Sequence, residues 1–546
     1  MTKFSISSKA PESSVNRRDF LARGAALAGV LGSGPGGLIL GAETKTAAAK
    51  GPIVNTTLGK LRGYTNNRVQ CFKGIPYGAS TAGDKRFLAP SKAAPWMNVR
   101  EAVELGHRSP QQPAPGEIPE VGAMDRREER AEDCLVLNVW TNSSKGTRPV
   151  MVWMHGGGYT SGSGGWIMWD GENLARKQDV VVVTLNHRLN AFGYLYLAGF
   201  NNEKYASASN IGMLDIVMAL EWVRDNIDRF GGDPKNVTIF GQSGGGGKVS
   251  TLLGMPAAKG LFHKAIVQSG SLVRGTPVEA AMKSSETLLA KFNLKPNQLD
   301  NLQRLPMDQI VMALRETQGL RLAPVLDGKT LPAGPFDPAA PEVSGAIPLM
   351  MGSVATEATF FNGTPLDPID DADLRRRTKQ YLRGDDAAVE RVIAAYRKDD
   401  PNLSNLDVYQ QMATDGSRQG VITEAERKFE QGKAPVYMYY FNWKSPVREG
   451  KLKAFHCIEV PFVFQNVDEC KIMTGDGKER YALADKVSLA WANFARTGNP
   501  NHSGLPKWPA YDTAKRETMV LDVESRITQD PGANGRKALL AERKTA

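Results

Sequence analysis

The sequence is poor in the residues that build disulfide frameworks and metal centres. Its 546 residues include four cysteines, at positions 71, 134, 457 and 470, and no two of them form a C-x-x-C pair. The six histidines include no pair spaced four residues apart. These absences exclude a small disulfide-stapled domain and an all-cysteine zinc site, and we expect no metal ion in the mechanism.

Extremes of charge and hydropathy are absent as well. Apolar residues make up 41% of the chain and charged residues 23%, which is ordinary for a globular protein and unlike a disordered one. The net charge is +10, but the basic residues are scattered. Their densest run, at 375–377, follows aspartates at 370, 371 and 373, which is typical of a solvated helix face. We therefore expect no nucleic-acid partner.

The first fifty residues have the pattern of a targeting segment. Residues 13–21 read S-S-V-N-R-R-D-F-L, and a stretch rich in glycine, alanine and leucine follows from 24 to 42. Paired arginines before a weakly apolar stretch are typical of a twin-arginine (Tat) export signal. A membrane anchor is the alternative, but several glycines and Pro35 interrupt the stretch too often for a spanning helix of about 20 residues.

We accordingly assign residues 1–49 to a Tat-type signal segment, with cleavage after either Ala42 or Ala49. No later segment approaches the length of a membrane span. The expected partner of the segment is the Tat export machinery. The mature chain is expected in the bacterial periplasm or outside the cell, without stable membrane insertion.

Residues 50–546 alternate strand-length apolar runs with helical patterns. A helical pattern with apolar residues at 3.6 spacing covers 211–230 and stops at two glycines. Runs of strand character lie at 149–154, 179–185, 237–240, 265–267, 347–351 and 436–441. Such alternation predicts an α/β fold with a large, mostly parallel central sheet and helices on both faces.

Nothing in this region marks a domain boundary. It contains no internal repeat and no linker rich in proline, glycine or serine. We therefore predict a single domain over residues 50–546. The charged helical segment 367–405 is expected to be an insertion over the carboxyl edge of the sheet.

A glycine-rich turn follows the strand at 237–240. It reads Gly241-Gln242-Ser243-Gly244-Gly245 and opens a helix, which matches the G-x-S-x-G nucleophile elbow. A sharp turn of this kind forces the serine into a strained conformation that exposes its hydroxyl, and the glycines remove side chains that would collide there. The pattern predicts Ser243 as a nucleophile.

Two phosphate-binding alternatives fail at the same turn. A Walker A loop ending at Lys248 needs glycine at 242 and serine or threonine at 249, where this chain has Gln242 and Val249. No G-x-G-x-x-G follows the first strand and opens a helix, so a dinucleotide site is also weakly supported. We predict no cofactor.

The strand at 149–154 ends in His155-Gly156-Gly157-Gly158. An H-G-G-G turn upstream of the elbow is the oxyanion loop of lipases and esterases. Acyl transfer places a full negative charge on one oxygen, and backbone N–H donors that face it stabilise the transition state. We predict Gly157, Gly158 and Gly244 as these donors. A merely tight loop is the alternative.

Chain order then selects the base and the acid, because in this fold the order is serine, acid, histidine. His263 lies on a helix-to-strand passage and His502 in a surface turn, which leaves His456 as the predicted base. Glu357 follows the strand at 347–351 and is the predicted acid. Asp327 is its rival, but Asp-Gly there is more simply a turn.

Many further blocks resemble the type-B carboxylesterase (cholinesterase-like) family of α/β hydrolases. They include F-K-G-I-P-Y at 72–77, E-D-C-L at 132–135, N-H-R-L at 186–189, F-G-G-D-P at 230–234, A-F-H at 454–456 and F-A-R-T-G-N-P at 494–500. The resemblance implies the α/β-hydrolase fold and places Ser243, Glu357 and His456 on the triad positions. It places Gly157, Gly158 and Gly244 on the oxyanion donors and Ser269 on a buried hydroxyl near the acid and base.

The chain also departs from that family. The usual upstream partner of Cys134 is missing, and whether Cys457 and Cys470 bridge stays open. Segment 111–133 holds no tryptophan, whereas cholinesterases carry one there for quaternary ammonium, so choline esters are not expected as preferred substrates. Trp166 and Trp169, with Met168 between them, either line the pocket mouth or pack in the core.

These features together predict a serine carboxylesterase. An ester carbonyl is attacked by Ser243, His456 acts as general base and then acid, Glu357 orients it, and water releases the acyl-enzyme. The same triad on an amide, carbamate or lactone is the first alternative, and a non-catalytic cholinesterase-like binding module is the second.

Overall fold

The computed structural model describes residues 51–112, 118–361 and 363–545. The predicted export signal and both of its cleavage positions lie outside these residues. Within the described ranges, no helix combines the length and the apolar character that crossing a membrane requires.

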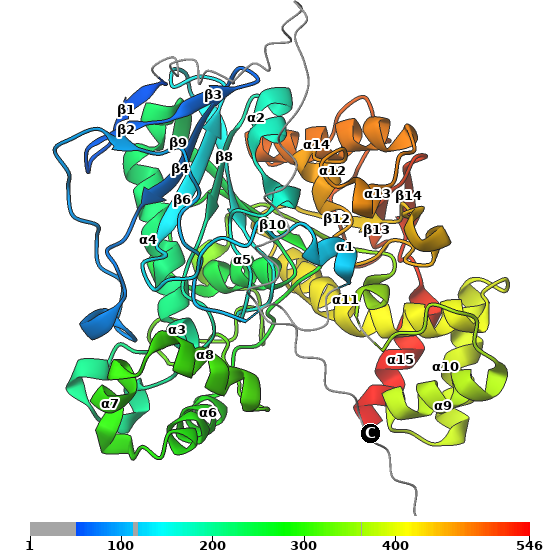
Figure 1. The fold of residues 1–546 in the computed structure, drawn as a ribbon. Helices are drawn as coiled ribbons and strands as arrows, with labels where there is room; N and C mark the ends of the chain where they lie inside the picture. Colours follow the sequence, from blue (N-terminus) through cyan, green and yellow to red (C-terminus); the bar gives the residue numbers. More distant parts are fainter. Residues whose placement is uncertain (1–50, 113–117, 362, 546) are drawn as a thin grey trace, which may run out of the picture. The chain divides into compact units, whose positions relative to one another are not determined.

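A large mixed sheet forms the centre of the fold (Figure 1). Its spatial order is β14-β13-β12-β11-β10-β9-β7-β8-β6-β4-β3. The strands are β3 (Tyr64–Asn66), β4 (Val69–Pro76), β6 (Val136–Thr141), β7 (Arg148–Met154), β8 (Val181–Leu185), β9 (Gly232–Gln242), β10 (Lys264–Gln268), β11 (Leu349–Val354), β12 (Val436–Phe441), β13 (Glu517–Leu521) and β14 (Arg526–Gln529). A smaller sheet joins β1 (Ile53–Asn55), β2 (Lys60–Arg62) and β5 (Arg100–Glu101).

The middle of the large sheet is parallel, as predicted. From β8 through β7, β9, β10, β11 and β12 to β13, each strand pairs in parallel with the next, and each strand-like run of the sequence overlaps one of these strands. The two margins are antiparallel: β3, β4, β6 and β8 on one side, β13 and β14 on the other. The antiparallel pairing at the margins was not predicted.

The apolar runs form strands because both faces of the sheet are covered. Along β7, Val150, Val152 and Met154 enter one core, while Met151 and Trp153 enter the other. Side chains alternate between the two faces of a strand, so a strand with two buried faces must be apolar throughout.

Helices cover each face. The first core contains the apolar sides of α4 (Ile211–Asn226) and α5 (Gly244–Gly254). The second contains those of α2 (Glu172–Gln178), α12 (Val460–Phe464) and α14 (Glu479–Thr497). The helix predicted at 211–230 is α4 with a final 3₁₀ turn, and it ends at Gly231 in the left-handed conformation (φ 74°).

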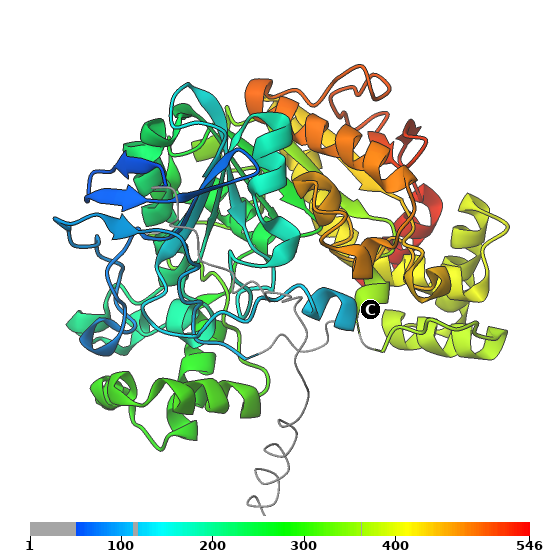
Figure 2. The ribbon, with the colours of Figure 1, turned by 45° about the horizontal axis from the view of Figure 1, so that its top comes forward.

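Two further groups of helices lie apart from each other, on either side of the sheet region (Figures 1 and 2). The green group is α6 (Val278–Lys291), α7 (Leu299–Arg304) and α8 (Met307–Glu316). The yellow group is α9 (Asp371–Leu382), α10 (Asp386–Asp399) and the long α11 (Asn405–Gln431), joined by α15 (Ala533–Thr545) from the end of the chain.

The yellow group contains the predicted helical insertion. Its helices share a core separate from those of the sheet, in which Leu374, Val392 and Met412 meet Leu539 of α15. Helix α11 links this group to the turn after β11, which it contacts. The insertion is therefore held by the C-terminal helix as well as by the sheet, which local sequence patterns did not indicate.

Candidate active site

Ser243 occupies the turn between β9 and α5. Its backbone has φ 57° and ψ −125°, a strained combination for a residue with a side chain. The Ser243 N–H donates to the Gln268 carbonyl at 2.8 Å, and its own carbonyl accepts from Gly247 N–H at 3.1 Å. A Cβ on Gly245 would lie 1.9 Å from the Met154 carbonyl oxygen. The turn is therefore held on both sides of the serine, as the elbow pattern predicts.

Glu357 and His456 meet beside this turn. Glu357 begins the short turn after β11, and His456 lies in the loop between β12 and α12. His456 Nδ1 and Glu357 Oε2 form a buried hydrogen bond and ion pair. Glu357 Oε1 also accepts from the Val354 N–H at 3.1 Å. The predicted acid and base are thus in direct contact although 99 residues separate them.

The two loops that carry these residues are tied together by their backbones. Thr356 N–H donates to the Ala454 carbonyl at 3.0 Å, and Thr356 pairs with Phe455 as a parallel bridge. The rings of Phe360 and Phe361 pack on the His456 imidazole, with centroids 5.2 and 5.7 Å away. The imidazole is therefore fixed by neighbours on several sides.

The environment of His456 favours its protonated form. Burial on its own would lower the pKa of the imidazole, but the Cys457 and Glu357 side chains beside the ring outweigh burial and raise the pKa well above its usual value. A base with a raised pKa binds the proton that it removes from a nucleophile more strongly.

The rival residues have structural roles. Asp327 Oδ1 accepts from the N–H groups of Lys329, Thr330 and Leu331, which makes it a turn residue as interpreted from the sequence. His263 Nδ1 accepts from the Val237 N–H at 3.1 Å near the predicted start of that strand. His502 Nε2 lies 3.0 Å from the Lys486 carbonyl oxygen.

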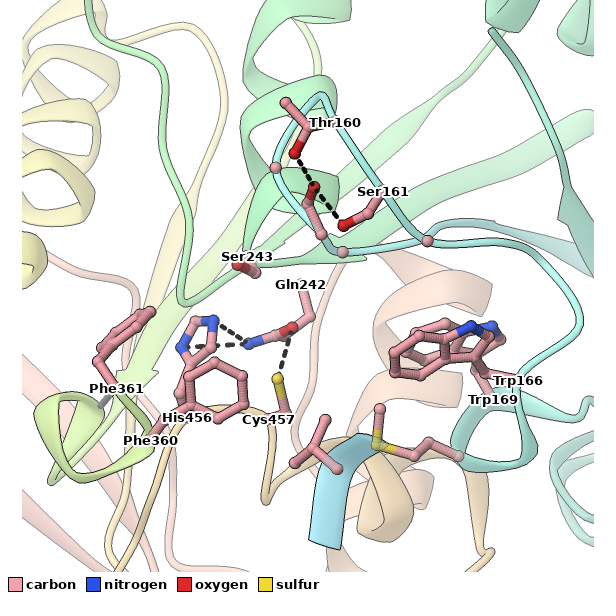
Figure 3. Close-up of a pocket in the computed structure, with 16 residues that line it drawn as sticks. Thr160, Ser161, Trp166, Trp169, Gln242, Ser243, Phe360, Phe361, His456 and Cys457 are labelled. Carbon is pink, nitrogen blue, oxygen red and sulfur yellow. Dashed lines mark hydrogen bonds between the residues drawn. The ribbon is translucent and has the colours of Figure 1, made fainter. Parts of the chain in front are cut away.

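Gln242 was missed by the sequence reasoning, where it was only the variable position of G-x-S-x-G. Its side-chain nitrogen lies 3.1 Å from His456 Nε2, and its oxygen accepts from the Cys457 thiol at 3.3 Å (Figure 3). No hydrogen bond joins Ser243 to His456 in the described part of the chain. In this state the Gln242 amide therefore competes with the serine for the nitrogen that acts as base.

The H-G-G-G loop closes over the elbow. Gly157 and Gly158 have φ 84° and 60°, conformations that favour glycine. The Gly157 carbonyl accepts from Ser161 N–H at 3.0 Å, and the Gly156 carbonyl lies 2.8 Å from His155 Nδ1. The N–H groups of Gly157, Gly158 and Gly244 find no acceptor among the described residues.

Gly244 is what lets the loop and the elbow touch. A Cβ on Gly244 would lie 2.3 Å from the Gly158 carbonyl oxygen and 2.5 Å from its nitrogen. The predicted donors from the loop and from the helix start therefore lie against each other, next to Ser243. Backbone donors at a helix N-terminus and in a glycine turn suit a developing negative charge.

Ser269 is beside the elbow but is not joined to the acid or base. Its N–H donates to the Gly352 carbonyl at 2.8 Å, while its buried Oγ has no hydrogen-bond partner in the described residues. The role that the resemblance implies for it stays a prediction. Nearby, burial and secondarily the Glu357 charge raise the pKa of the buried Glu459 carboxyl to about 7.

A cavity of about 230 Å³ opens between these groups. Figure 3 shows Ser243 and His456 on one side and the indoles of Trp166 and Trp169 across from them. The two indoles stack at 5.2 Å and are almost wholly buried, so they line the cavity and also pack in the core. A second cavity, of about 650 Å³, shares the wall residues Thr160 and Ser161.

The cysteines were also considered for a disulfide, and the acidic residues for a metal site. Cys457 and Cys470 are thiols and not the two halves of a disulfide, which answers the question left open by their spacing. Within the described ranges, no group of three or more His, Cys, Asp or Glu residues is placed to hold a metal ion.

Comparison with known proteins gives matches over most of the chain. A family model described as "Carboxylesterase family" matches residues 50–538. The chain is 38% identical over 506 residues to a para-nitrobenzyl esterase of Bacillus subtilis, covering 89% of this chain and 98% of that protein. It is 33% identical over 498 residues to a phenmedipham hydrolase of Pseudarthrobacter oxydans, covering 88% and 97%.

Solved structures give the same result for the fold. A structure of a PNB esterase superposes with a TM-score of 0.77 at 36% identity, covering 89% of this chain and 99% of that one. The predicted α/β-hydrolase architecture is confirmed by this likeness.

Proposed function

Because the chain belongs to the carboxylesterase family and is a carboxylic-ester hydrolase, we propose that Ser243, His456 and Glu357 carry out its hydrolysis of esters. The observation that carries the proposal is the buried contact of His456 with Glu357 beside the strained Ser243 turn. A non-catalytic binding module is set aside, because the chain has all three residues: Ser243 and His456 line one cavity, and Glu357 is hydrogen-bonded to His456 behind it.

The geometry fits acyl transfer in two steps. The hydroxyl of Ser243 attacks the ester carbonyl while His456 Nε2 takes its proton, and the protonated imidazole then gives the proton to the departing alcohol. Water, activated by the same imidazole, releases the acid from the acyl-enzyme. Glu357 accepts from His456 Nδ1, which fixes the tautomer and stabilises the imidazolium without taking the proton.

The N–H groups of Gly157, Gly158 and Gly244 would hold the oxyanion of each tetrahedral intermediate. The side-chain amide of Gln242 leaves His456 Nε2 before the attack, because that nitrogen cannot hold both Gln242 and Ser243 in the transferring geometry. The hydrogen bond from Ser243 to His456 would then form only when substrate is bound, as catalytic hydrogen bonds often do.

The cavity supports a substrate with an apolar group of modest size. Its walls include the indoles of Trp166 and Trp169, the rings of Phe360 and Phe361, and Val121. Apolar and aromatic walls with a few polar groups are typical of small-molecule sites. An aryl or short acyl ester fits this description, and amides, carbamates and lactones remain alternatives for the same machinery.

The test is a panel of p-nitrophenyl esters hydrolysed by the purified mature chain and by Ser243→Ala. The variant should lose on the order of 10⁶ in kcat, by analogy with loss of the nucleophile in other serine hydrolases. A fluorophosphonate should label Ser243 and no other serine. A variant within tenfold of the parent would contradict the assignment of the nucleophile.

We also propose export through the Tat pathway to the periplasm or the medium. The support is the R-R-D-F-L pattern within residues 1–49, ahead of the weakly apolar stretch. Fractionation of cells that express the full chain should place the processed protein outside the cytoplasm. Replacing Arg17 and Arg18 by lysine should keep the unprocessed chain inside, and unchanged export would contradict the proposal.

A further inference from the structure

A lysine lies under the oxyanion loop. Lys248 is on α5, and its side chain is wholly buried. Its Nζ donates to the carbonyl of His155 at 2.9 Å and to the carbonyl of Gly158 at 2.8 Å. The ring of Tyr159 lies 5.5 Å from the same nitrogen. Among the described residues, no carboxylate forms an ion pair with it.

These two carbonyls flank the peptides that matter for catalysis. The Gly157 and Gly158 N–H groups belong to the peptides 156–157 and 157–158. The carbonyls that Lys248 binds belong to the peptide just before this pair and the peptide just after it. The carbonyls between them are taken by His155 Nδ1 and by the Ser161 N–H. All four carbonyls of residues 155–158 are therefore hydrogen-bonded. Because the N–H of a peptide points opposite to its carbonyl, these bonds also fix the direction of the Gly157 and Gly158 N–H groups.

Such a side chain is costly to bury. Burial alone lowers the pKa of Lys248 to about 7, because the ammonium has lost water and gained no carboxylate. The imidazoles of His155 and His187, stacked at 4.9 Å, have lowered pKa values first through burial and next through Lys248. The ring of Tyr159, another titratable group, also faces this lysine. An apolar side chain of similar length would avoid this cost.

We propose that Lys248 is a positioning residue for the oxyanion hole, holding the Gly157 and Gly158 N–H groups toward the carbonyl that Ser243 attacks. The inference rests on the proposed function of Ser243. Lys248 touches no substrate: it fixes the loop before the reaction begins, so the donors need no rearrangement as charge develops. A protonated or a neutral amine can make both hydrogen bonds, so the role does not depend on its charge.

The chain offers a matched control in Lys428 of α11. Its Nζ also donates to two backbone carbonyls, those of Ser344 at 2.9 Å and Gly345 at 2.7 Å. Burial lowers the pKa of Lys428 to about 8. Both lysines thus donate to two backbone carbonyls, but Lys428 also donates to Gln431 Oε1 at 2.9 Å and binds a loop outside the candidate site.

The experiment compares Lys248→Met and Lys428→Met. Misplacement of catalytic groups by about 1 Å costs on the order of 100-fold, so Lys248→Met should lower kcat by about that factor with KM changed less than about threefold. The inhibition constant of a trifluoromethyl ketone, which forms the tetrahedral adduct, should rise by a similar factor. Lys428→Met should leave both unchanged.

A kcat within about threefold of the parent would overturn the proposal, as would equal losses in both variants, which would indicate a general loss of stability. Ser243→Ala separates the two claims, because an inactive Ser243→Ala with a fully active Lys248→Met refutes only the role of the lysine.

If Lys248→Met does not fold, Lys248→Gln takes its place, since it keeps a donor on a shorter side chain. The second measurement combines the lysine variant with Gly244→Ala. If both act by moving the loop, the double variant loses less than the product of the two single losses. If the loss of kcat in the double variant equals the product of the two single losses, Lys248 does not act through the oxyanion loop.

Discussion

The two sides of Ser243 are built in different ways. The acid–base side consists of side chains, Glu357 and His456, from loops after different strands, and its chemistry depends on a proton. The oxyanion side consists of backbone amides from one glycine turn and one helix start, and its chemistry depends on position. The first side is sensitive to residue identity and to pH, whereas the second is sensitive to displacement of the chain. Substitutions can separate these two kinds of dependence.

The largest expected effect is on the acid–base side. Glu357→Gln keeps the shape of the side chain but removes the carboxylate that orients His456, and in a comparable triad this change costs about 10⁴ in kcat. The Glu357 side chain also raises the pKa of His456, so its removal lowers that pKa. Activity is lost as the pH falls through the pKa of the base, and the acid limb should therefore move to lower pH.

The measurement is kcat/KM for a p-nitrophenyl ester as a function of pH. A Glu357→Gln variant with its acid limb unmoved, or with near-normal kcat, would place the orienting acid elsewhere. Asp327→Asn serves as the control, because that carboxylate accepts turn N–H groups and should leave the acid limb in place.

A smaller effect is expected on the oxyanion side. Gly244→Ala places a methyl group 2.3 Å from the Gly158 carbonyl oxygen, so the loop must move away from the elbow. Loss of one oxyanion donor costs about 10²–10³ in kcat, and we expect a loss in this range with the pH profile unchanged. Steady-state kinetics over a range of pH tests both parts. A shifted pH profile would show that the two sides are not independent.

Gly122→Ala is the control for that substitution. An added Cβ at Gly122 meets no atom within 4 Å, so the variant gains the same methyl group without a collision. Its kcat should stay close to that of the parent. A comparable loss in both variants would mean that the effect of Gly244→Ala does not come from the loop.

The smallest effect is expected at Gln242, which lies on the border of the two sides. Gln242→Leu removes the amide that competes with Ser243 for His456 Nε2. One hydrogen bond contributes about 0.5–1.5 kcal/mol, so inactivation by a fluorophosphonate should become about twofold to tenfold faster. The rate is measured by quenching the labelling reaction at successive times and quantifying the labelled protein. Slower inactivation would identify Gln242 as a support of the base and not a competitor.

The same contrast explains what could be predicted from the sequence. Glycine patterns mark backbone features, so the elbow at Ser243 and the turn of Gly157 and Gly158 were identified from short motifs. The apolar runs predicted the parallel strands because burial on both faces leaves no polar positions. Chain order and strand ends then selected Glu357 and His456, which the structure places in contact.

What the sequence did not indicate depends on side-chain direction and on long-range docking. The pattern G-x-S-x-G leaves Gln242 unspecified, and only the fold turns its amide toward His456. Lys248 was considered only as the lysine of a phosphate-binding loop, because nothing local shows that its ammonium reaches the carbonyls of the glycine loop after β7. The packing of α10 on α15 joins segments more than 130 residues apart, which periodicity cannot detect.

Thr160 and Ser161 line both cavities and also support the oxyanion loop, because their side-chain hydroxyls each donate to the Gly157 carbonyl at 3.3 Å. Selection for a bulkier substrate through these two positions would therefore act on turnover at the same time. A variant that accepts larger substrates through changes at these two positions should turn over more slowly, unless a second substitution restores the lost hydrogen bonds to the Gly157 carbonyl. Residues that line the larger cavity alone, such as Leu314 and Leu320, offer an evolutionary route without that trade-off.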